Sequence, residues 1–152
     1  MIVYRVGRTK FCRDLSGEGA RLHGGRWNHI LTPCIYTSES RALALLEYTV
    51  NVNIVDIPRS LSITSFEIPE KGIKEFAISE LPKNWKDAPA PASTKDFGTN
   101  LLSLMTFPIL KIPSTIIPQE FNFILNPKHI DANTFKILAV EEFIYDSRIK
   151  SV

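Results

Sequence analysis

The sequence has few of the residues that would place it among metal-binding, membrane-spanning or polyanion-binding proteins. Among its 152 residues are two cysteines and three histidines, and neither set has a metal-ligand spacing such as CxxC or HExxH. No apolar run approaches the ~20 residues that a membrane-spanning helix needs. The formal net charge of +2 is small for a protein that binds nucleic acid or a membrane surface. We therefore expect no metal, no membrane segment and no direct nucleic-acid partner.

The first residues also lack the pattern of a signal peptide. Arg5 follows Met1-Ile2-Val3-Tyr4, so charge appears before any long apolar stretch. We therefore expect a cytoplasmic protein, in which Cys12 and Cys34 are reduced thiols. The sequence does not by itself exclude a disulfide between them.

Composition predicts one soluble globular domain. Hydrophobic residues make up 44% and charged residues 22% of the chain, which are ordinary proportions for such a protein. A chain of 152 residues has the size of one domain and can bury a core without disulfides or metal. We therefore expect a single domain over residues 1–152.

Hydrophobic patterning predicts an α+β fold with a mixed sheet and two or three helices. Helices are expected over about 41–50, with Ser38 and Ser40 as candidate N-caps, and over 98–105. Residues 16–28 hold four glycines and are expected to form a long functional loop, and 81–91 form a proline-rich connector. The expected strands are 2–6, 34–37, 61–68, 73–78, 107–112, 121–125 and 135–143.

The helix expected over 41–50 carries a carboxylate in apolar surroundings. At 100° per residue its main apolar stripe places Glu47 at the margin, and further apolar residues predict burial nearly all round. No basic residue lies three or four positions from Glu47 to pair with it. Such a carboxylate is either functional or a rim residue that reaches water or a distant arginine. The stripe consists of Ala42, Leu43, Leu46 and Val50.

The glycine-rich loop ends in His23-Gly24-Gly25-Arg26-Trp27-Asn28. Two glycines allow a backbone to approach a ligand closely, and the planar guanidinium of Arg26 suits a pyrophosphate. The alternative is a tight turn with an exposed arginine. The dinucleotide fingerprint GxGxxG is absent, and Gly17-Glu18-Gly19 is not followed by a helical pattern.

Two further candidates lie at the ends of expected strands. Tyr36 precedes the Glu47 helix and is either a core residue or a ring that stacks on a planar ligand. Ser114 follows Pro113 and is either a turn serine or a functional hydroxyl.

Taken in order, the motifs resemble the RES domain, a family of toxins from toxin–antitoxin pairs, over essentially the whole chain. The matching segments are Tyr4-Arg5-Val6, Ser16-Gly17-Glu18-Gly19-Ala20, Gly24-Gly25-Arg26-Trp27-Asn28, Tyr36-Thr37-Ser38-Glu39, Ala44-Leu45-Leu46-Glu47, Leu81-Pro82-Lys83-Asn84-Trp85, Pro113-Ser114, Asn122-Phe123-Ile124-Leu125-Asn126-Pro127 and Phe143-Ile144-Tyr145-Asp146-Ser147-Arg148.

The resemblance implies a fold similar to ADP-ribosyltransferases, NAD+ as substrate and an Xre-like antitoxin as partner. The Arg, Glu and Ser that name the family match Arg26, Glu47 and Ser114, and its important tyrosine matches Tyr36. These four are the expected catalytic residues. The expected NAD+-binding residues are Arg5, Gly25, Arg26, Asn28, Tyr36 and Asn126.

Members of the family deplete NAD+ or ADP-ribosylate a protein, so the resemblance implies cleavage of the nicotinamide–ribose bond. The acceptor of ADP-ribose stays open between water, phosphate and a protein side chain, and a homodimer is compatible with the sequence. One alternative is an RNA-cleaving toxin that uses His23, Arg26 and Glu47 for acid–base chemistry, which the small net charge disfavours. The other is a non-catalytic domain whose glycine loop docks a partner.

Overall fold

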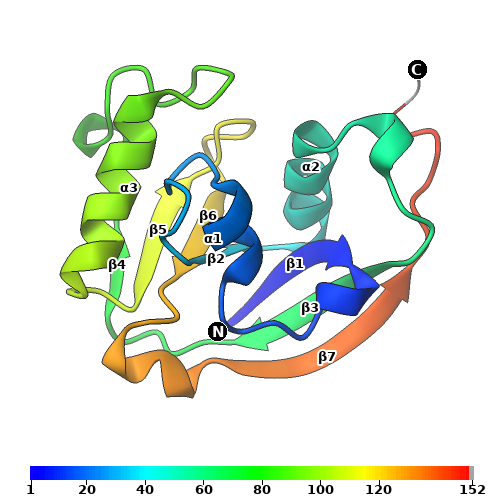
Figure 1. Ribbon diagram of the computed structural model, residues 1–152, viewed down its shortest axis with the longest axis horizontal. Coiled ribbons are helices and arrows are strands. Elements are labelled where there is room, and N and C mark those ends of the chain that lie inside the picture. Colours follow the sequence, from blue (N-terminus) through cyan, green and yellow to red (C-terminus); the bar gives the residue numbers. More distant parts are fainter. Residues whose placement is uncertain (151–152) are drawn as a thin grey trace.

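The computed structural model describes residues 1–150, and within them the chain forms one seven-stranded sheet and three α-helices (Figure 1). The helices are α1 (Glu18–His23), α2 (Arg41–Asn51) and α3 (Ala92–Leu104). The strands are β1 (Ile2–Arg8), β2 (Ile35–Ser38), β3 (Leu61–Glu67), β4 (Ile73–Glu75), β5 (Ile109–Pro113), β6 (Phe121–Leu125) and β7 (Lys136–Phe143). In this described part, no helix has both the length and the apolar character needed to cross a membrane.

The sheet has the strand order β4-β5-β6-β2-β1-β3-β7 and is mixed, because β4 and β5 are parallel while the other pairs are antiparallel. Strands β1 and β2 share a single paired position, Tyr4 with Ser38, whereas β1 and β3 are paired along seven positions. The sheet therefore divides into two half-sheets, β4-β5-β6-β2 and β1-β3-β7; in Figure 1, β5 rises steeply, whereas β3 and β7 run across the lower part of the molecule.

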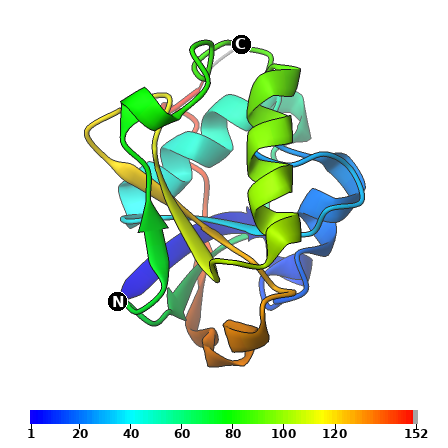
Figure 2. The same cartoon turned by 90° about the vertical axis from the view of Figure 1, so that its left-hand side faces the viewer.

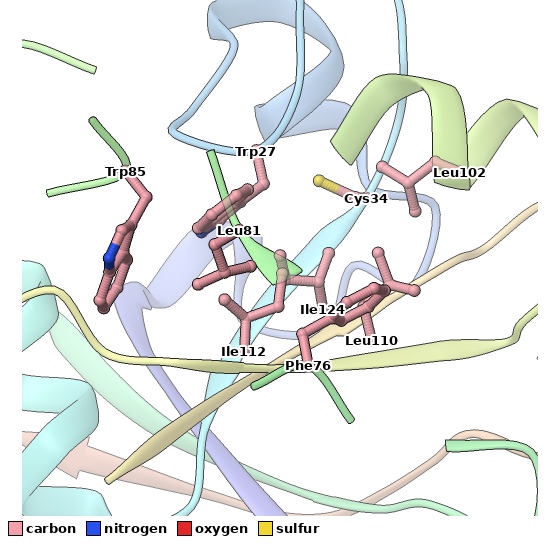
Figure 3. Packing of buried hydrophobic residues seen from close by; sticks show 9 residues of the cluster. All are labelled: Trp27, Cys34, Phe76, Leu81, Trp85, Leu102, Leu110, Ile112 and Ile124. Carbon is pink, nitrogen blue, oxygen red and sulfur yellow. The ribbon is translucent and has the colours of Figure 1, made fainter. Parts of the chain in front are cut away.

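Three apolar clusters hold the helices against the sheet and the two half-sheets together. The first packs α3 and the tryptophans Trp27 and Trp85 on one face of β5 and β6; Figure 3 shows the two indoles at one end of the cluster and Leu102 at the other. The second lies on the opposite face and joins the two half-sheets through residues such as Val3 and Phe123. The third lies beneath α2. The 3-10 turn Ile130–Thr134 (orange) lies at the far end of the molecule from the proline-rich connector in Figure 2.

The glycine-rich segment is not a loop throughout, because residues Glu18–His23 form α1. The prediction that no helix follows Gly17 is wrong. Asp14 supplies what the pattern does not show: its carboxylate accepts hydrogen bonds from the backbone N–H groups of Gly17 (3.1 Å) and Glu18 (3.2 Å) at the start of the helix. A short helix with a glycine inside it has too few turns to display an apolar period.

Helix α3 begins at Ala92, six residues before the expected start at Gly98. Ser93, Thr94 and Gly98 are weak helix formers, which is why sequence patterning misses the first half. Gly98 lies in mid-helix because the backbone of Trp27 passes directly against it, and a Cβ atom there would overlap the Trp27 carbonyl oxygen. The glycine thus lets α3 lie against the loop that carries Arg26.

Gly98→Ala is expected to lower the free energy of unfolding by about 3 kcal/mol, the upper end of the usual cost of overpacking, because the overlap is with backbone atoms that cannot rotate away. Chemical denaturation measures the change. The matched control is Gly19→Ala in α1, where nothing lies within 4 Å of the added Cβ and the better helix propensity of alanine stabilises by about 0.5–1 kcal/mol. Equal effects of the two substitutions would show that the Trp27 contact is not tight.

Cys12 and Cys34 are both buried free thiols, and burial raises the pKa of Cys34 to about 12. Only a thiolate attacks a disulfide reagent rapidly, which protects Cys34, and burial also denies a reagent access to Cys12. We therefore expect neither cysteine to react with a thiol reagent in the native protein. Both should react after denaturation without prior reduction, which a colorimetric thiol count measures. A count below two in the denatured, unreduced protein would indicate a disulfide.

Candidate active site

Helix α2 presents Glu47 to the sheet. Ser40 caps the helix by accepting a hydrogen bond from Leu43 N–H (3.1 Å), as the sequence predicted. Leu43 and Ala44 pack onto the sheet, and Glu47 follows Leu43 by four positions, so it points between these two directions toward the sheet. Its side chain is partly buried.

The predicted apolar stripe of α2 is wrong in its register. Ala42 is exposed, and Val50 retains 54% of its surface, so the helix is not buried nearly all round. Thr49 is buried instead, because the C-terminal segment returns to it: Tyr145 shares a hydrogen bond with its hydroxyl, and Lys150 Nζ donates to its carbonyl. A contact from about 100 residues away is invisible in the period of one helix.

One carboxylate oxygen of Glu47 is held by two donors from two different strand ends. Oε1 accepts hydrogen bonds from Ser114 Oγ (2.7 Å) and from Asn122 Nδ2 (2.6 Å). No group among residues 1–150 donates to Oε2, and no fully buried side-chain oxygen in that part of the chain lacks a partner, so Oε2 is at least partly exposed to solvent. The site therefore presents one fixed, accessible carboxylate oxygen.

Ser114 is completely buried just after β5. Its Oγ accepts hydrogen bonds from the backbone N–H groups of Ile116 (3.1 Å) and Ile117 (3.3 Å). These donors occupy the acceptor side of the hydroxyl, so its proton is directed to Glu47. The local turn thus fixes both the position and the donor role of Ser114.

Asn122 and Ser38 belong to this constellation but were not among the predicted site residues. They are paired across β2 and β6, and Ser38 Oγ donates to Asn122 Oδ1 (2.6 Å). A chain of hydrogen bonds therefore runs from Ser38 through Asn122 to Glu47. The available signal was Asn122, the polar residue of the otherwise apolar strand β6, but its pairing with Ser38 depends on a register that joins residues 84 positions apart.

Arg26 lies within electrostatic range of Glu47. Burial lowers the pKa of the Arg26 guanidinium, and the charge of Glu47 opposes that shift. Nη1 donates to the carbonyl oxygens of Trp85 (3.0 Å) and Asp87 (2.7 Å) in the proline-rich connector. Nε and Nη2 have no partner among residues 1–150 and, by the same reasoning as for Glu47 Oε2, are accessible. They are free to bind an anion.

Tyr36 organises the loop that carries Arg26. Its hydroxyl donates to Asn28 Oδ1 (2.6 Å) and accepts from Trp27 N–H (3.0 Å), and its burial raises the pKa of the hydroxyl well above the usual value. Gly25 lies against the ring: a Cβ there would be 2.7 Å from the Tyr36 hydroxyl oxygen. Gly25 is therefore required for protein packing, whatever further use a ligand makes of it.

Asn28 is fully buried, and its Nδ2 donates to the carbonyl oxygens of Ala20, His29 and Thr32. Asn126, at the end of β6 remote from Asn122, is also buried and donates to Leu102 O at the end of α3. Both side chains are committed to loop and helix ends. Neither amide NH2 group is therefore free for the expected contact with NAD+.

Arg5 is separate from the site. Side chains alternate along a strand: Tyr4 contacts Arg41 of α2, whereas Arg5 lies over Phe66 on the opposite face. Its Nη2 donates to the carbonyl oxygens of Phe11, Cys12 and Asp14, and burial lowers the pKa of the guanidinium. The structure gives Arg5 the role of holding the 11–14 loop, and it does not join Arg26, Tyr36, Glu47 and Ser114.

The geometry defines a class of site: a fixed carboxylate within electrostatic range of a partly buried arginine on a small α+β fold. In residues 1–150 no group of three or more His, Cys, Asp or Glu side chains could hold a metal ion. The RES domain family matches residues 2–146, and the chain belongs to this family.

Curated relatives cover nearly all of the chain. It is 38% identical over 155 residues to "Toxin Res" of Photorhabdus laumondii (98% of this chain, 97% of the relative) and 34% identical over 152 residues to "Toxin Res" of Yersinia enterocolitica (99% and 100%). It is 34% identical over 145 residues to the "Prs ADP-ribosylating toxin" of a Sphingobium strain (93% and 90%). The predictions of a RES-family toxin and of an enzyme that degrades NAD+ or transfers its ADP-ribose are confirmed.

A chain in the crystal structure of the M. tuberculosis MbcT–MbcA toxin–antitoxin complex has a similar fold. The superposition gives a TM-score of 0.77 at 16% identity and covers 94% of this chain and 84% of the other. The predicted α+β fold with a mixed sheet is confirmed.

Proposed function

We propose that this protein is a toxin that cleaves the nicotinamide–ribose bond of NAD+, with Glu47 and Arg26 contacting the substrate. One observation carries the proposal: Glu47 is locked through Oε1 by Ser114 and Asn122, while Oε2 remains free within electrostatic range of Arg26. The names of the relatives support ADP-ribosyl chemistry, for which NAD+ is the donor.

When the bond between ribose and nicotinamide breaks, its electron pair leaves with the nicotinamide nitrogen, and the ribose becomes oxocarbenium-like, as in glycoside cleavage. A carboxylate close to the ribose stabilises this cation and accepts a hydrogen bond from a ribose hydroxyl. Glu47 Oε2 has the charge and the accessibility for both tasks. Because Oε1 is already fixed, little reorganisation is needed as the positive charge develops.

Arg26 holds the pyrophosphate through Nε and Nη2, while Nη1 remains anchored to the Trp85 and Asp87 carbonyls. A guanidinium presents its donors as a planar fork that matches phosphate oxygens. Tyr36 and Ser114 act as positioning residues: Tyr36 fixes the Arg26 loop, and Ser114 fixes Glu47. This assignment replaces the expectation that the Tyr36 ring stacks on a planar ligand.

The acceptor decides the reaction class and is identified by its product. Purified protein incubated with NAD+ should release nicotinamide and form free ADP-ribose with water, a phosphorylated ADP-ribose when phosphate is added, or a modified protein when a cell extract is added. Mass spectrometry separates these products. Cleavage of added RNA without nicotinamide release would instead support the RNA-cleaving alternative.

A toxin that drains NAD+ in the cytoplasm of its own cell requires a protein that blocks it, and we assign this role to an Xre-like antitoxin. The simplest block is a segment that enters the NAD+ site and places an anionic group at Arg26, whose Nε and Nη2 are free. Expression of the protein alone should therefore stop growth and lower cellular NAD+, and co-expression of the antitoxin should restore both.

Competition tests whether the antitoxin occupies the NAD+ site. The Glu47→Gln variant serves as the binding protein because it should not consume the NAD+ added to it. Saturating NAD+ should raise the apparent Kd of the antitoxin, in proportion to the NAD+ concentration, since two ligands cannot fill one site. An antitoxin Kd that is independent of NAD+ would mean that inhibition acts from another surface.

A further inference from the structure

The hydrogen-bond chain that ends on Glu47 Oε1 has two members that the sequence did not place in the site: Asn122, and Ser38, which was expected only as a candidate helix cap. Asn122 Nδ2 donates to Glu47 (2.6 Å), and Ser38 Oγ donates to Asn122 Oδ1 (2.6 Å). The three residues come from β6, β2 and α2, so the chain joins separate elements of the fold at one point. The hydrogen bond from Asn122 to Glu47 Oε1 is about as short as the hydrogen bond from Ser114 to the same oxygen, which is 2.7 Å long.

We infer that Asn122, supported by Ser38, is a positioning residue that sets the orientation of the Glu47 carboxylate for the cleavage reaction. This inference rests on the proposed NAD+ cleavage. A carboxylate can only accept hydrogen bonds, so the NH2 group of Asn122 must face Glu47 and its carbonyl oxygen must face Ser38. The direction of the chain is thus dictated by chemistry.

Two donors on one oxygen constrain the carboxylate more than Ser114 alone does. A single hydrogen bond leaves the carboxylate free to rotate about that contact, whereas donors from two strand ends fix the plane of the group. Oε2 is thereby aimed into the accessible site. Because stabilisation of a developing cation depends on the placement of the charge, removing Asn122 should affect the reaction step more than NAD+ binding, which depends on Arg26.

The test is steady-state kinetics of nicotinamide release by Asn122→Ala. Loss of a hydrogen-bond partner that orients a metal ligand typically costs about 10- to 100-fold in activity; by analogy we expect a loss of this size in kcat with little change in KM. Asn133→Ala, at an exposed asparagine of the Ile130–Thr134 turn, is the matched control and should retain the wild-type kcat. A wild-type kcat for Asn122→Ala would overturn the inference.

Asn122→Asp supplies a pH profile that a purely structural role would not produce. The new carboxylate has no proton to donate and repels Glu47, so kcat should be low at neutral pH. Lowering the pH should restore part of it, because one shared proton between the two carboxyl groups recreates the hydrogen bond. The wild-type enzyme and Asn133→Asp should show no such recovery on acidification. A parallel pH profile for all three proteins would contradict the positioning role.

Ser38→Ala tests whether the residues act as a chain. Alone it should lower kcat less than Asn122→Ala does, since Glu47 still orients the amide. In the Asn122→Ala background it should have no further effect, because its only route to Glu47 has been removed. Fully additive effects would show that Ser38 acts independently. If the wild-type protein releases no nicotinamide at all, the proposed function fails, whereas an active wild type with unaffected Asn122 variants refutes only this inference.

Discussion

Replacement of Glu47 by glutamine should lower kcat for nicotinamide release by ~10²-fold or more, the usual effect of removing one electrostatic group from a transition state. Glutamine has the same shape, and its amide oxygen can accept the hydrogen bonds from Ser114 and Asn122 that Oε1 accepts now. Its NH2 group then takes the place of Oε2. The variant therefore loses the negative charge and the free acceptor while keeping the contacts that hold the side chain.

Two measurements separate this chemical loss from a loss of structure. The free energy of unfolding should be nearly unchanged, because both donors on Oε1 remain satisfied. Glu142→Gln, at an exposed position on β7, makes the same change of charge outside the site and should retain wild-type kcat. Turnover close to wild type in Glu47→Gln would remove Glu47 from the mechanism.

Replacement of Arg26 by lysine should weaken NAD+ binding by about 10- to 100-fold, because hydrogen bonds to charged groups contribute about 1.5–3 kcal/mol each. Arg26 can anchor the connector through Nη1 and bind a phosphate through Nε and Nη2 at the same time. Lysine has one nitrogen for both tasks and lacks the planar fork. The defect should appear in KM, and in the Kd for NAD+, at least as strongly as in kcat.

Arg13→Lys is the matched control, since Arg13 is exposed and the substitution preserves charge in the same way. It should bind and turn over NAD+ normally. Normal NAD+ affinity in Arg26→Lys would show that a point charge is sufficient and that Arg26 makes no bidentate phosphate contact.

Most elements of the fold follow from local patterns in the sequence. The serine cap and length of α2, the strand positions and the proline-rich connector are all properties of short segments, and the structure agrees with them within a few residues. The failures have specific physical causes. Helix α1 depends on capping by Asp14, the buried face of α2 depends on the C-terminal segment, and the start of α3 is hidden by Gly98, which is needed for the Trp27 contact.

The residues of the candidate site likewise fall into those that local motifs predict and those that depend on long-range contacts. Arg26, Tyr36, Glu47 and Ser114 were predicted from motifs, and the structure places all four on one side of the sheet. Asn122 and Ser38 were missed because their function depends on the register between β2 and β6 and on the position of α2 over it. Conversely, Asn28, Asn126 and Arg5 occur in the motifs, but their side chains hold loops and helix ends.

The most direct test of the account is nicotinamide release from NAD+ by the purified protein, followed over time beside Glu47→Gln at equal concentration. Wild-type protein should release many equivalents of nicotinamide per site without added metal, and Glu47→Gln should release it at least ~10²-fold more slowly. Equal rates for the two proteins, or no release by folded wild-type protein with water, phosphate and cell extract all supplied as acceptors, would contradict the central claim.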